Sequence, residues 1–221
     1  MTKQIEFACI GNRGRSPVAE IIGRNHLRKA GALGNYDTCS SGILVNEIKN
    51  GAPPTAKAIA PYVRMGLERD DVYSEVGSLG VEHLLKRVES GEELGHTELD
   101  ALAKLYGMAM DTFGREEVEH RAEALRHFGI EGKVKETQDQ TIIRPEAIAI
   151  FGMDKIVVDG VREIYSGSGY NPVIDVLGKV ATGDMGVALP NAFGKGKQEY
   201  FRCVEALLEQ VPKVMDTALR L

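Results

Sequence analysis

The feature that most constrains the fold is a strand, a short loop and a helix in direct succession over residues 4–22. An apolar run reaches Cys9, which indicates a buried strand. The pair Ser16-Pro17 then favours a helix start, with Ser16 as the N-cap and Pro17 in the first turn, and apolar residues recur at helical spacing after it. The loop 9–15 therefore lies between the end of a strand and the N-terminus of a helix.

A loop in this position is suited to binding a tetrahedral anion. Its backbone N–H groups add to the positive end of the helix dipole. Gly11 and Gly14 allow the backbone to curl tightly, and the guanidinium of Arg15 offers a planar, two-pronged donor to anion oxygens. Cys9 lies at the base of this anion cradle, where a thiol loses its proton more readily than a free cysteine does. A thiolate beneath a bound phosphoryl group is a nucleophile in position.

The pattern Cys9-x5-Arg15-Ser16-Pro17, with Gly11-Asn12 inside it, resembles the signature loop of the low-molecular-weight protein tyrosine phosphatases. The related thioredoxin-coupled arsenate reductases share much of this loop. The resemblance implies that the cysteine attacks phosphorus, the arginine holds the phosphoryl oxygens, the asparagine shapes the loop and the serine stabilises the thiolate. It implies these phosphate-binding residues: Ile10, Gly11, Asn12, Arg13, Gly14, Arg15 and Ser16. The alternative is a buried strand-end cysteine followed by a solvated arginine.

Composition limits the remaining possibilities. The chain has 221 residues, of which 43% are hydrophobic and 27% charged, so it can bury a sizeable core. Its net charge of −5 favours neither nucleic acid nor an anionic membrane as a partner. Without an apolar signal segment or a run of transmembrane length, we expect a cytoplasmic protein. The three cysteines, Cys9, Cys39 and Cys203, form no closely spaced pair, which argues against disulfides and a zinc ribbon.

Later segments predict an α/β fold. A short strand over 36–42 ends in Ser40-Ser41-Gly42, which resembles a segment beside the active loop in the family. Residues 145–158 predict a helix leading into a buried strand, with Asp154 and Asp159 in capping or solvated roles. A fourth strand over 173–177 and a closing helix over 197–221 complete the pattern. Strands separated by helices predict a four-stranded parallel doubly wound sheet, and the resemblance implies the strand order 2-1-3-4.

A helical insertion interrupts the resemblance. We expect the phosphatase-like domain to comprise 1–66 and 129–221, and the insertion to comprise 67–128. Apolar periodicity predicts three helices there, over 81–91, 97–113 and 115–129. Their apolar stripes cover the parent domain, one another or a second subunit, so a homodimer through the insertion is possible. The histidines show no paired spacing, and we expect no metal and no cofactor.

The segment before the last helix departs from the family pattern. The family has Asp-Pro there, and its aspartate protonates the leaving oxygen, but this chain has Asn191-Ala192. Phe193 keeps the position of the aromatic residue beside the substrate. An asparagine amide can donate a hydrogen bond to the leaving oxygen but cannot transfer a proton to it. Asp184 is a candidate replacement acid if its loop folds back, although an aspartate flanked by glycine is ordinarily a turn residue.

Arg13 is a second departure, because phosphatases of the family have an apolar residue or threonine there. It leads to the hypothesis of a substrate with a second anionic group, although an arginine pointing into solvent is an equal alternative.

Three functions remain open. The first is a cysteine phosphatase acting on a phosphorylated protein or small molecule. The second is a catalytically impaired phosphate-binding protein that acts through its insertion. The third is an arsenate reductase, for which the chain lacks a neighbouring pair of resolving thiols.

Overall fold

The computed structural model describes residues 2–46, 56–69, 71–73, 78–135, 137–184 and 189–221. The chain divides into two compact units, the first made of 1–50 with 118–221 and the second of 51–117. The second unit begins and ends earlier than the insertion expected at 67–128. It begins earlier because helix α3 (Ala56–Leu67) packs against α4 (Ser78–Glu89) in this unit.

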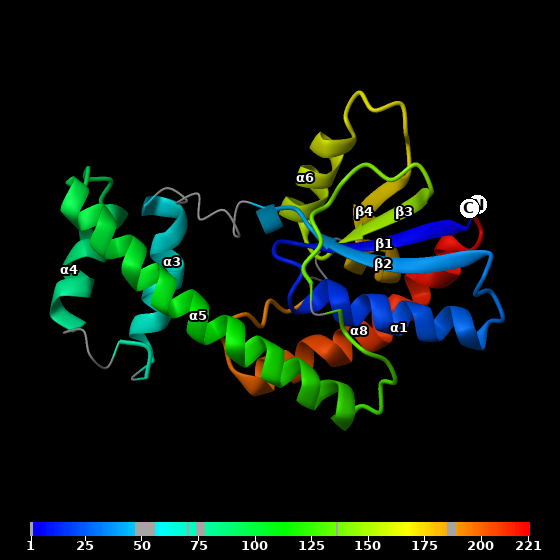
Figure 1. The fold of residues 1–221 in the computed structure, drawn as a ribbon, viewed down its shortest axis with the longest axis horizontal. Helices are drawn as coiled ribbons and strands as arrows, with labels where there is room; N and C mark the ends of the chain where they lie inside the picture. The colour runs from blue at the N-terminus through cyan, green and yellow to red at the C-terminus, as the bar shows by residue number, and fades with distance from the viewer. Residues whose placement is uncertain (1, 47–55, 70, 74–77, 136, 185–188) are drawn as a thin grey trace. The chain divides into compact units, whose positions relative to one another are not determined.

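The first unit is built on a four-stranded parallel sheet in the order β2-β1-β3-β4, as predicted (Figure 1). The strands are β1 (Lys3–Cys9), β2 (Tyr36–Gly42), β3 (Ala147–Gly152) and β4 (Val173–Val176). In the register of the sheet Cys9 pairs with Gly42, and Ala8 pairs with Gly152. The carboxyl ends of the three neighbouring strands therefore meet at one edge, where the loop 9–15 begins.

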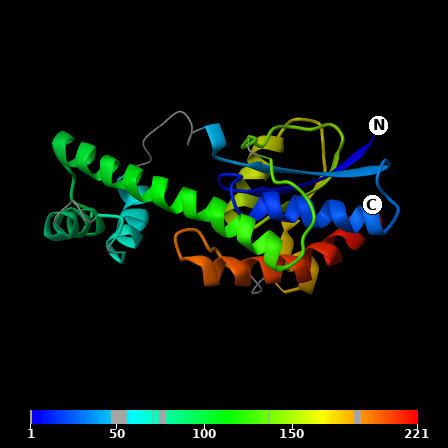
Figure 2. The ribbon, with the colours of Figure 1, turned by 60° about the horizontal axis from the view of Figure 1, so that its bottom comes forward.

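Helices cover both faces of this sheet. Helices α1 (Arg15–Lys29) and α8 (Lys197–Ala218) pack together on one face, and α6 (Lys155–Tyr165) lies on the other (Figures 1 and 2). The short helix α7 (Leu177–Thr182) follows β4 and packs against α8. Side chains alternate along β1, so that Ile5 and Phe7 enter the α1/α8 core while Ala8 enters the α6 core. Apolar cores on both faces of the sheet therefore fix β1, the strand from which the loop starts.

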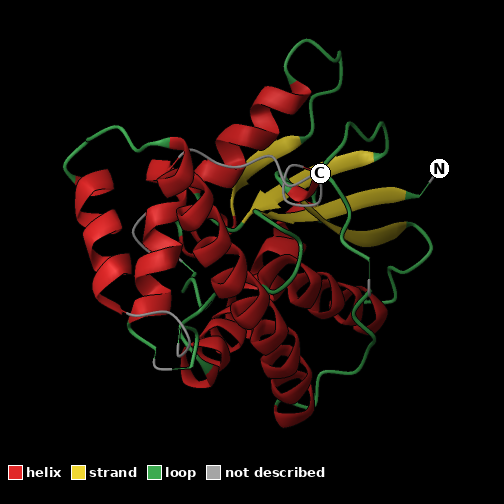
Figure 3. Cartoon of the chain, turned by 60° about the vertical axis from the view of Figure 1, so that its left-hand side comes forward, coloured by secondary structure: helices red, strands yellow, loops and turns green. Residues whose placement is uncertain are grey.

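The second unit contains α3, α4 and the first part of α5 (His96–His127), which Figure 1 labels; Figure 3 draws all helices of the chain in red and the strands in yellow. Arg69 pairs with Glu116 at 2.5 Å, and the Tyr73 hydroxyl donates to the Leu105 carbonyl at 2.9 Å. Leu85, Leu102 and Phe113 are fully buried. None of the described helices is long and apolar enough to cross a membrane.

The prediction of separate helices over 97–113 and 115–129 was wrong, because α5 is one continuous helix from His96 to His127. A single Gly114 costs a helix about 1 kcal/mol, too little to stop one with strong helix formers on both sides. Leu99 and Val118, two residues of the predicted apolar stripes, are 42% and 46% exposed. The helix ends at His127, and Gly129 follows it with a left-handed φ of 60°, a conformation typical of a helix C-terminus.

The predicted order of elements over 145–158 was also wrong. The strand comes first, as β3, and α6 follows it. The run Ala149–Phe151 is buried between β1 and β4, and a strand covered on both faces reads as a continuous apolar stretch that periodicity does not separate from a helix. Asp154 is confirmed as a cap, since its carboxylate accepts from the Val157 backbone N–H at 3.0 Å.

Candidate functional site

Cys9 lies at the end of β1 and is 5% exposed. Its Sγ accepts two hydrogen bonds, one from the Asn12 backbone N–H at 3.1 Å and one from the Ser16 hydroxyl at 3.0 Å. Both donors stabilise a thiolate more than a neutral thiol, because hydrogen bonds to a charged acceptor are about twice as strong as neutral ones. The local geometry therefore favours a nucleophilic sulfur.

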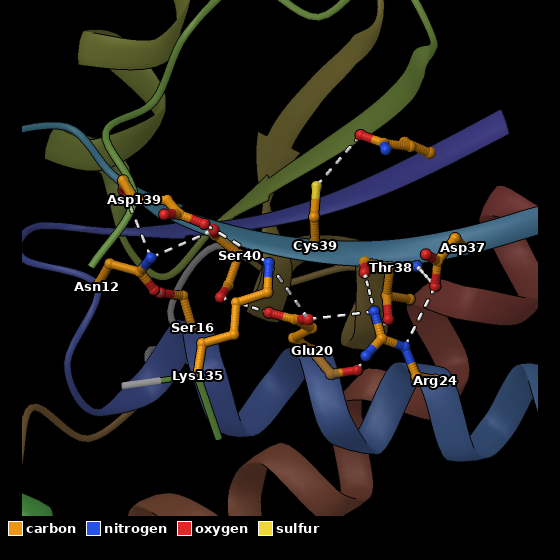
Figure 4. Close-up of polar contacts among 11 residues, drawn as sticks. Asn12, Ser16, Glu20, Arg24, Asp37, Thr38, Cys39, Ser40, Lys135 and Asp139 are labelled. Carbon is orange, nitrogen blue, oxygen red and sulfur yellow. Dashed lines mark hydrogen bonds and ion pairs between the residues drawn. The ribbon is translucent and has the colours of Figure 1, made fainter. Parts of the chain in front are cut away.

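Asn12 holds the loop in a conformation that few residues adopt. Its φ of +49° lies in the left-handed region, where asparagine is tolerated better than most residues. Asn12 is 4% exposed. Its side-chain amide donates to the carbonyl oxygens of Ser40 at 3.2 Å and Asp139 at 3.4 Å (Figure 4). Its Oδ1 accepts from the Ser16 hydroxyl at 3.1 Å. These contacts tie the middle of the loop to β2 and to the segment that precedes β3.

The prediction that Ser16 is the helix N-cap was wrong. Helix α1 begins at Arg15 with Gly14 at the N-cap position and no side-chain cap. The Ser16 hydroxyl is instead fully buried and points at three acceptors: the sulfur of Cys9, Oδ1 of Asn12, and the Ser41 carbonyl at 3.2 Å. A cap would use this oxygen as an acceptor for backbone N–H groups, whereas here the same hydroxyl serves as a donor.

Arg15 is held by a carboxylate that the sequence did not connect with it. Its Nη2 lies 3.3 Å from Oδ2 of Asp154, and the two side chains are 10% and 35% exposed. Asp154 uses its other oxygen to cap α6, so its position is fixed from both ends. The five N–H donors of a guanidinium leave others for an anion while this contact orients the group. Asp154 lies just beyond the end of β3, which pairs in parallel with β1. Because neighbouring parallel strands end at the same edge of the sheet, their predicted adjacency was the sequence signal for this contact.

Four carbonyl groups of the loop accept hydrogen bonds from neighbouring elements. The Cys9 and Ile10 carbonyls accept from the backbone N–H groups of Ile43 and Leu44, each at 3.0 Å. The Arg13 carbonyl accepts from Nη1 of Arg121 on α5, and the Gly14 carbonyl accepts from the Tyr200 hydroxyl on α8 at 3.3 Å. Sequence reasoning missed Arg121, which lies 108 residues from its partner.

Gly42 allows β2 to approach the loop closely. A Cβ at this position would lie 2.7 Å from both the Asn12 nitrogen and the Ile10 oxygen. Both atoms belong to the backbone, so neither can move away without deforming the loop. This clash explains why a glycine, and no larger residue, ends the Ser40-Ser41-Gly42 segment.

A buried polar network supports the same edge of the sheet. Glu20 on α1 is 4% exposed, accepts from the Ser40 hydroxyl at 2.7 Å and pairs with Arg24 at 3.2 Å (Figure 4). Lys135 lies 4.0 Å from the same carboxylate and 3.5 Å from Asp139. The strand and the segment that bind the Asn12 side chain are therefore themselves fixed by charge pairs.

A second buried carboxylate, Glu6, lies on β1 and is completely inaccessible to solvent. It accepts from the Ser41 hydroxyl, and its Oε2 lies 3.5 Å from Nε of Arg144. Burial raises the pKa of Glu6, although the Ser41 hydrogen bond and the Arg144 charge oppose the rise. Burial likewise raises the pKa of the Cys39 thiol, which lies on β2 with 8% exposure.

The residues predicted for the leaving group lie on other segments. Asn191 is exposed in the stretch that leads to α8, between the buried residues Leu189 and Ala192, and Phe193 is half-buried. Within the described part of the chain, Asn191 makes no hydrogen bond with the loop. Asp184 is exposed after α7, where its backbone N–H donates to the Thr182 hydroxyl at 3.2 Å. The structure thus brings Cys9, Asn12, Arg15 and Ser16 together, and the roles of the later residues stay predictions.

Comparisons with known proteins agree with this fold and loop. The family model of the low molecular weight phosphotyrosine protein phosphatases matches residues 4–73. A low molecular weight phosphotyrosine protein phosphatase from Schizosaccharomyces pombe is 49% identical over 43 residues, which is 19% of this chain. The match spans only 28% of the length of that curated relative.

Two solved structures resemble the chain over nearly its whole length. A YwlE mutant from Bacillus subtilis has a TM-score of 0.55 and 16% identity, with 100% of both chains covered. A low molecular weight phosphotyrosine phosphatase from Vibrio cholerae O395 has a TM-score of 0.55 and 14% identity, with 97% of this chain and 95% of that chain covered. The resemblance to the low molecular weight phosphotyrosine protein phosphatases is therefore confirmed, and the chain has their fold.

Proposed function

We propose that the chain is a cysteine-dependent phosphatase that hydrolyses a phosphomonoester of the phosphotyrosine kind. The observation that carries this proposal is the Cys9 sulfur, which accepts hydrogen bonds from Asn12 and Ser16 at the start of a loop that ends in Arg15. A sulfur placed between two donors and followed by a guanidinium is arranged for attack on a bound anion.

The proposed reaction has two displacements at phosphorus. The Cys9 thiolate forms an S–P bond while the P–O bond to the leaving group breaks, and the electron pair goes to the leaving oxygen, which takes up a proton. Water then attacks the phosphocysteine, the S–P bond breaks, and the thiolate and inorganic phosphate are released. Arg15 and the N–H groups of the loop stabilise the three equatorial oxygens during both steps.

The proton for the leaving oxygen is the incomplete part of this mechanism. Asn191 occupies the position of the family's general acid and cannot supply a proton. General-acid catalysis contributes about 10²–10⁴-fold, so the enzyme should favour substrates whose leaving group departs as an anion. Asp184 remains the candidate replacement, acting if its loop folds back toward the site.

Asn191 also supports a second candidate, a phosphate-binding protein with little catalysis that acts through its helical insertion. An arsenate reductase is supported less well. Cys39 and Cys203 are 8% and 1% exposed. Burial raises the pKa of the Cys39 thiol, which disfavours the thiolate that a resolving cysteine needs.

The first experiment compares turnover of p-nitrophenyl phosphate by the wild type and Cys9→Ser, with phosphate binding measured in parallel. This leaving group needs little protonation, so a phosphatase should turn it over despite Asn191, and Cys9→Ser should abolish turnover. A folded wild type that binds phosphate without turning over the substrate would favour the binding protein. Turnover that survives Cys9→Ser would refute the cysteine mechanism.

Substrate preference is tested at Arg13, which is partly exposed in the loop. We propose that its charge favours a substrate with a second anionic group, because an added cation near the loop attracts a dianionic ligand more than a monoanionic one. Arg13→Ala should then lower kcat/KM for doubly anionic phosphates more than for singly anionic ones. An unchanged ratio would refute the hypothesis.

A cytoplasmic location and a homodimer through the helical insertion stay predictions.

A further inference from the structure

Two kinds of hydrogen-bond donor hold the carbonyl groups of the loop. Backbone N–H groups after β2 hold the carbonyls of Cys9 and Ile10, whereas two side chains hold those of Arg13 and Gly14. Backbone contacts of the first kind persist whatever the side chain is. The second half of the loop therefore depends on the identity of Arg121 and Tyr200.

The direction of a carbonyl fixes the direction of the next N–H group. In a planar trans peptide the C=O of one residue and the N–H of the next point to opposite sides, and no described peptide bond is cis. With the Arg13 carbonyl turned toward Arg121, the Gly14 N–H points away from α5. With the Gly14 carbonyl turned toward Tyr200, the Arg15 N–H points away from α8.

We propose that Arg121 and Tyr200 are positioning residues that keep the N–H groups of Gly14 and Arg15 directed at the bound phosphoryl oxygens. The proposal rests on the proposed function, since it concerns the same anion cradle. Neither residue touches the substrate in this proposal; each acts through a peptide plane. Arg121 lies on the part of α5 that belongs to the first unit, as the loop does.

The two residues should differ in importance. Reversing the Arg13–Gly14 peptide changes φ of Gly14, and a residue without Cβ tolerates the reversed conformation about as well as the original. Reversing the Gly14–Arg15 peptide changes φ of Arg15, which the first turn of α1 already restricts. Arg121 thus opposes a reversal that the backbone permits, whereas Tyr200 opposes a reversal that the first turn of α1 already disfavours.

The test uses Arg121→Met, with Arg121→Lys as the conservative variant and Arg126→Met as the matched control. Arg126 lies on the same helix and is exposed. Inorganic phosphate is titrated into ¹⁵N-labelled protein while the amide resonances of Gly14 and Arg15 are followed, and kcat and KM for p-nitrophenyl phosphate are measured. Alkylation of Cys9 by iodoacetamide provides a readout of the nucleophile alone.

For Arg121→Met we expect the phosphate-dependent shift of the Gly14 amide to disappear and kcat to fall about 10²-fold, as when one oxyanion donor is lost. The alkylation rate of Cys9 should change less than about twofold, because the donors to its sulfur, Asn12 and Ser16, are not held by Arg121. Arg121→Lys should recover most of kcat, since an ammonium also donates to a carbonyl, and Arg126→Met should match the wild type.

Several results would overturn the proposal. These are an unchanged Gly14 shift and kcat in folded Arg121→Met, an equal loss in Arg126→Met, or a parallel loss of Cys9 alkylation. If Arg121→Met fails to fold, Tyr200→Phe tests the same idea by removing one hydroxyl, with a severalfold loss of kcat expected and no change refuting it. A wild type that binds phosphate without turnover refutes the phosphatase function but leaves the Gly14 shift as the test of positioning. Failure of the wild type to bind phosphate refutes both.

Discussion

Ser16→Ala tests whether the buried hydroxyl stabilises the nucleophilic form of Cys9. The hydroxyl has one proton and three acceptors within 3.2 Å. When Cys9 is a thiolate, the proton goes to the sulfur in a charged hydrogen bond worth about 1.5–3 kcal/mol. When Cys9 is a neutral thiol, the proton turns to Asn12 or Ser41 in a neutral bond worth about 0.5–1.5 kcal/mol. The serine therefore favours the thiolate by the difference, roughly 1–1.5 kcal/mol.

That difference corresponds to about a factor of ten, since a factor of ten equals about 1.4 kcal/mol. We expect iodoacetamide to alkylate Cys9 about tenfold more slowly in Ser16→Ala than in the wild type at the same pH. The matched control is Ser40→Ala, whose hydroxyl donates to Glu20 rather than to sulfur. Equal rates in Ser16→Ala and the wild type, or an equal loss in Ser40→Ala, would refute the reasoning.

Three further predictions follow from the structure. Gly42→Ala should lower kcat at least tenfold with a wild-type circular dichroism spectrum, because the new Cβ would lie 2.7 Å from the Asn12 nitrogen; wild-type kinetics would contradict the clash. Burial raises the pKa of Glu6 above its ordinary 4.5, so the folded state binds this proton more tightly than the unfolded state, and stability falls as pH rises through the raised pKa. Urea unfolding from pH 4.5 to about 8 should therefore show Glu6→Gln gaining stability relative to the wild type as pH rises, and a pH-independent difference would refute this. Asn191→Asp should raise turnover of phenyl phosphate by about 10²-fold while leaving p-nitrophenyl phosphate nearly unchanged, and a gain of equal size on both substrates would exclude a general-acid role.

The parts of the fold that sequence predicted are those in which neighbouring residues carry the information. The strand before Cys9, the helix after Pro17 and the sheet order follow from local apolar patterns and from the resemblance of one loop. The β3 segment was misassigned because a strand buried on both faces lacks alternation. The break expected near Gly114 was wrong because helix propensity is a weak signal beside the packing of the whole of α5.

The contacts that sequence did not predict join residues far apart in the chain. Arg15 meets Asp154 across 139 positions, and Gly14 meets Tyr200 across 186. Each partner has an ordinary local explanation, as a helix cap or as a core aromatic residue, and that explanation hides its second contact. The side of a strand or helix on which a residue lies is visible in sequence, but the neighbour it meets there depends on how the elements pack.

This division between local and distant contacts also separates the two halves of the proposed chemistry. The donors to the Cys9 sulfur come from within a span of eight residues, 9–16, so the nucleophile is assembled whenever the strand, loop and helix form. Protonation of the leaving oxygen requires a side chain from a segment such as the one before α8, where Asn191 stands. A substitution there leaves the thiolate and the loop amides untouched, because they act on the sulfur and the equatorial oxygens and not on the leaving group. In the proposed mechanism, an asparagine in place of a general acid should therefore narrow the range of leaving groups without preventing formation of the proposed phosphocysteine. The two halves are separated by measuring how kcat depends on the basicity of the leaving group.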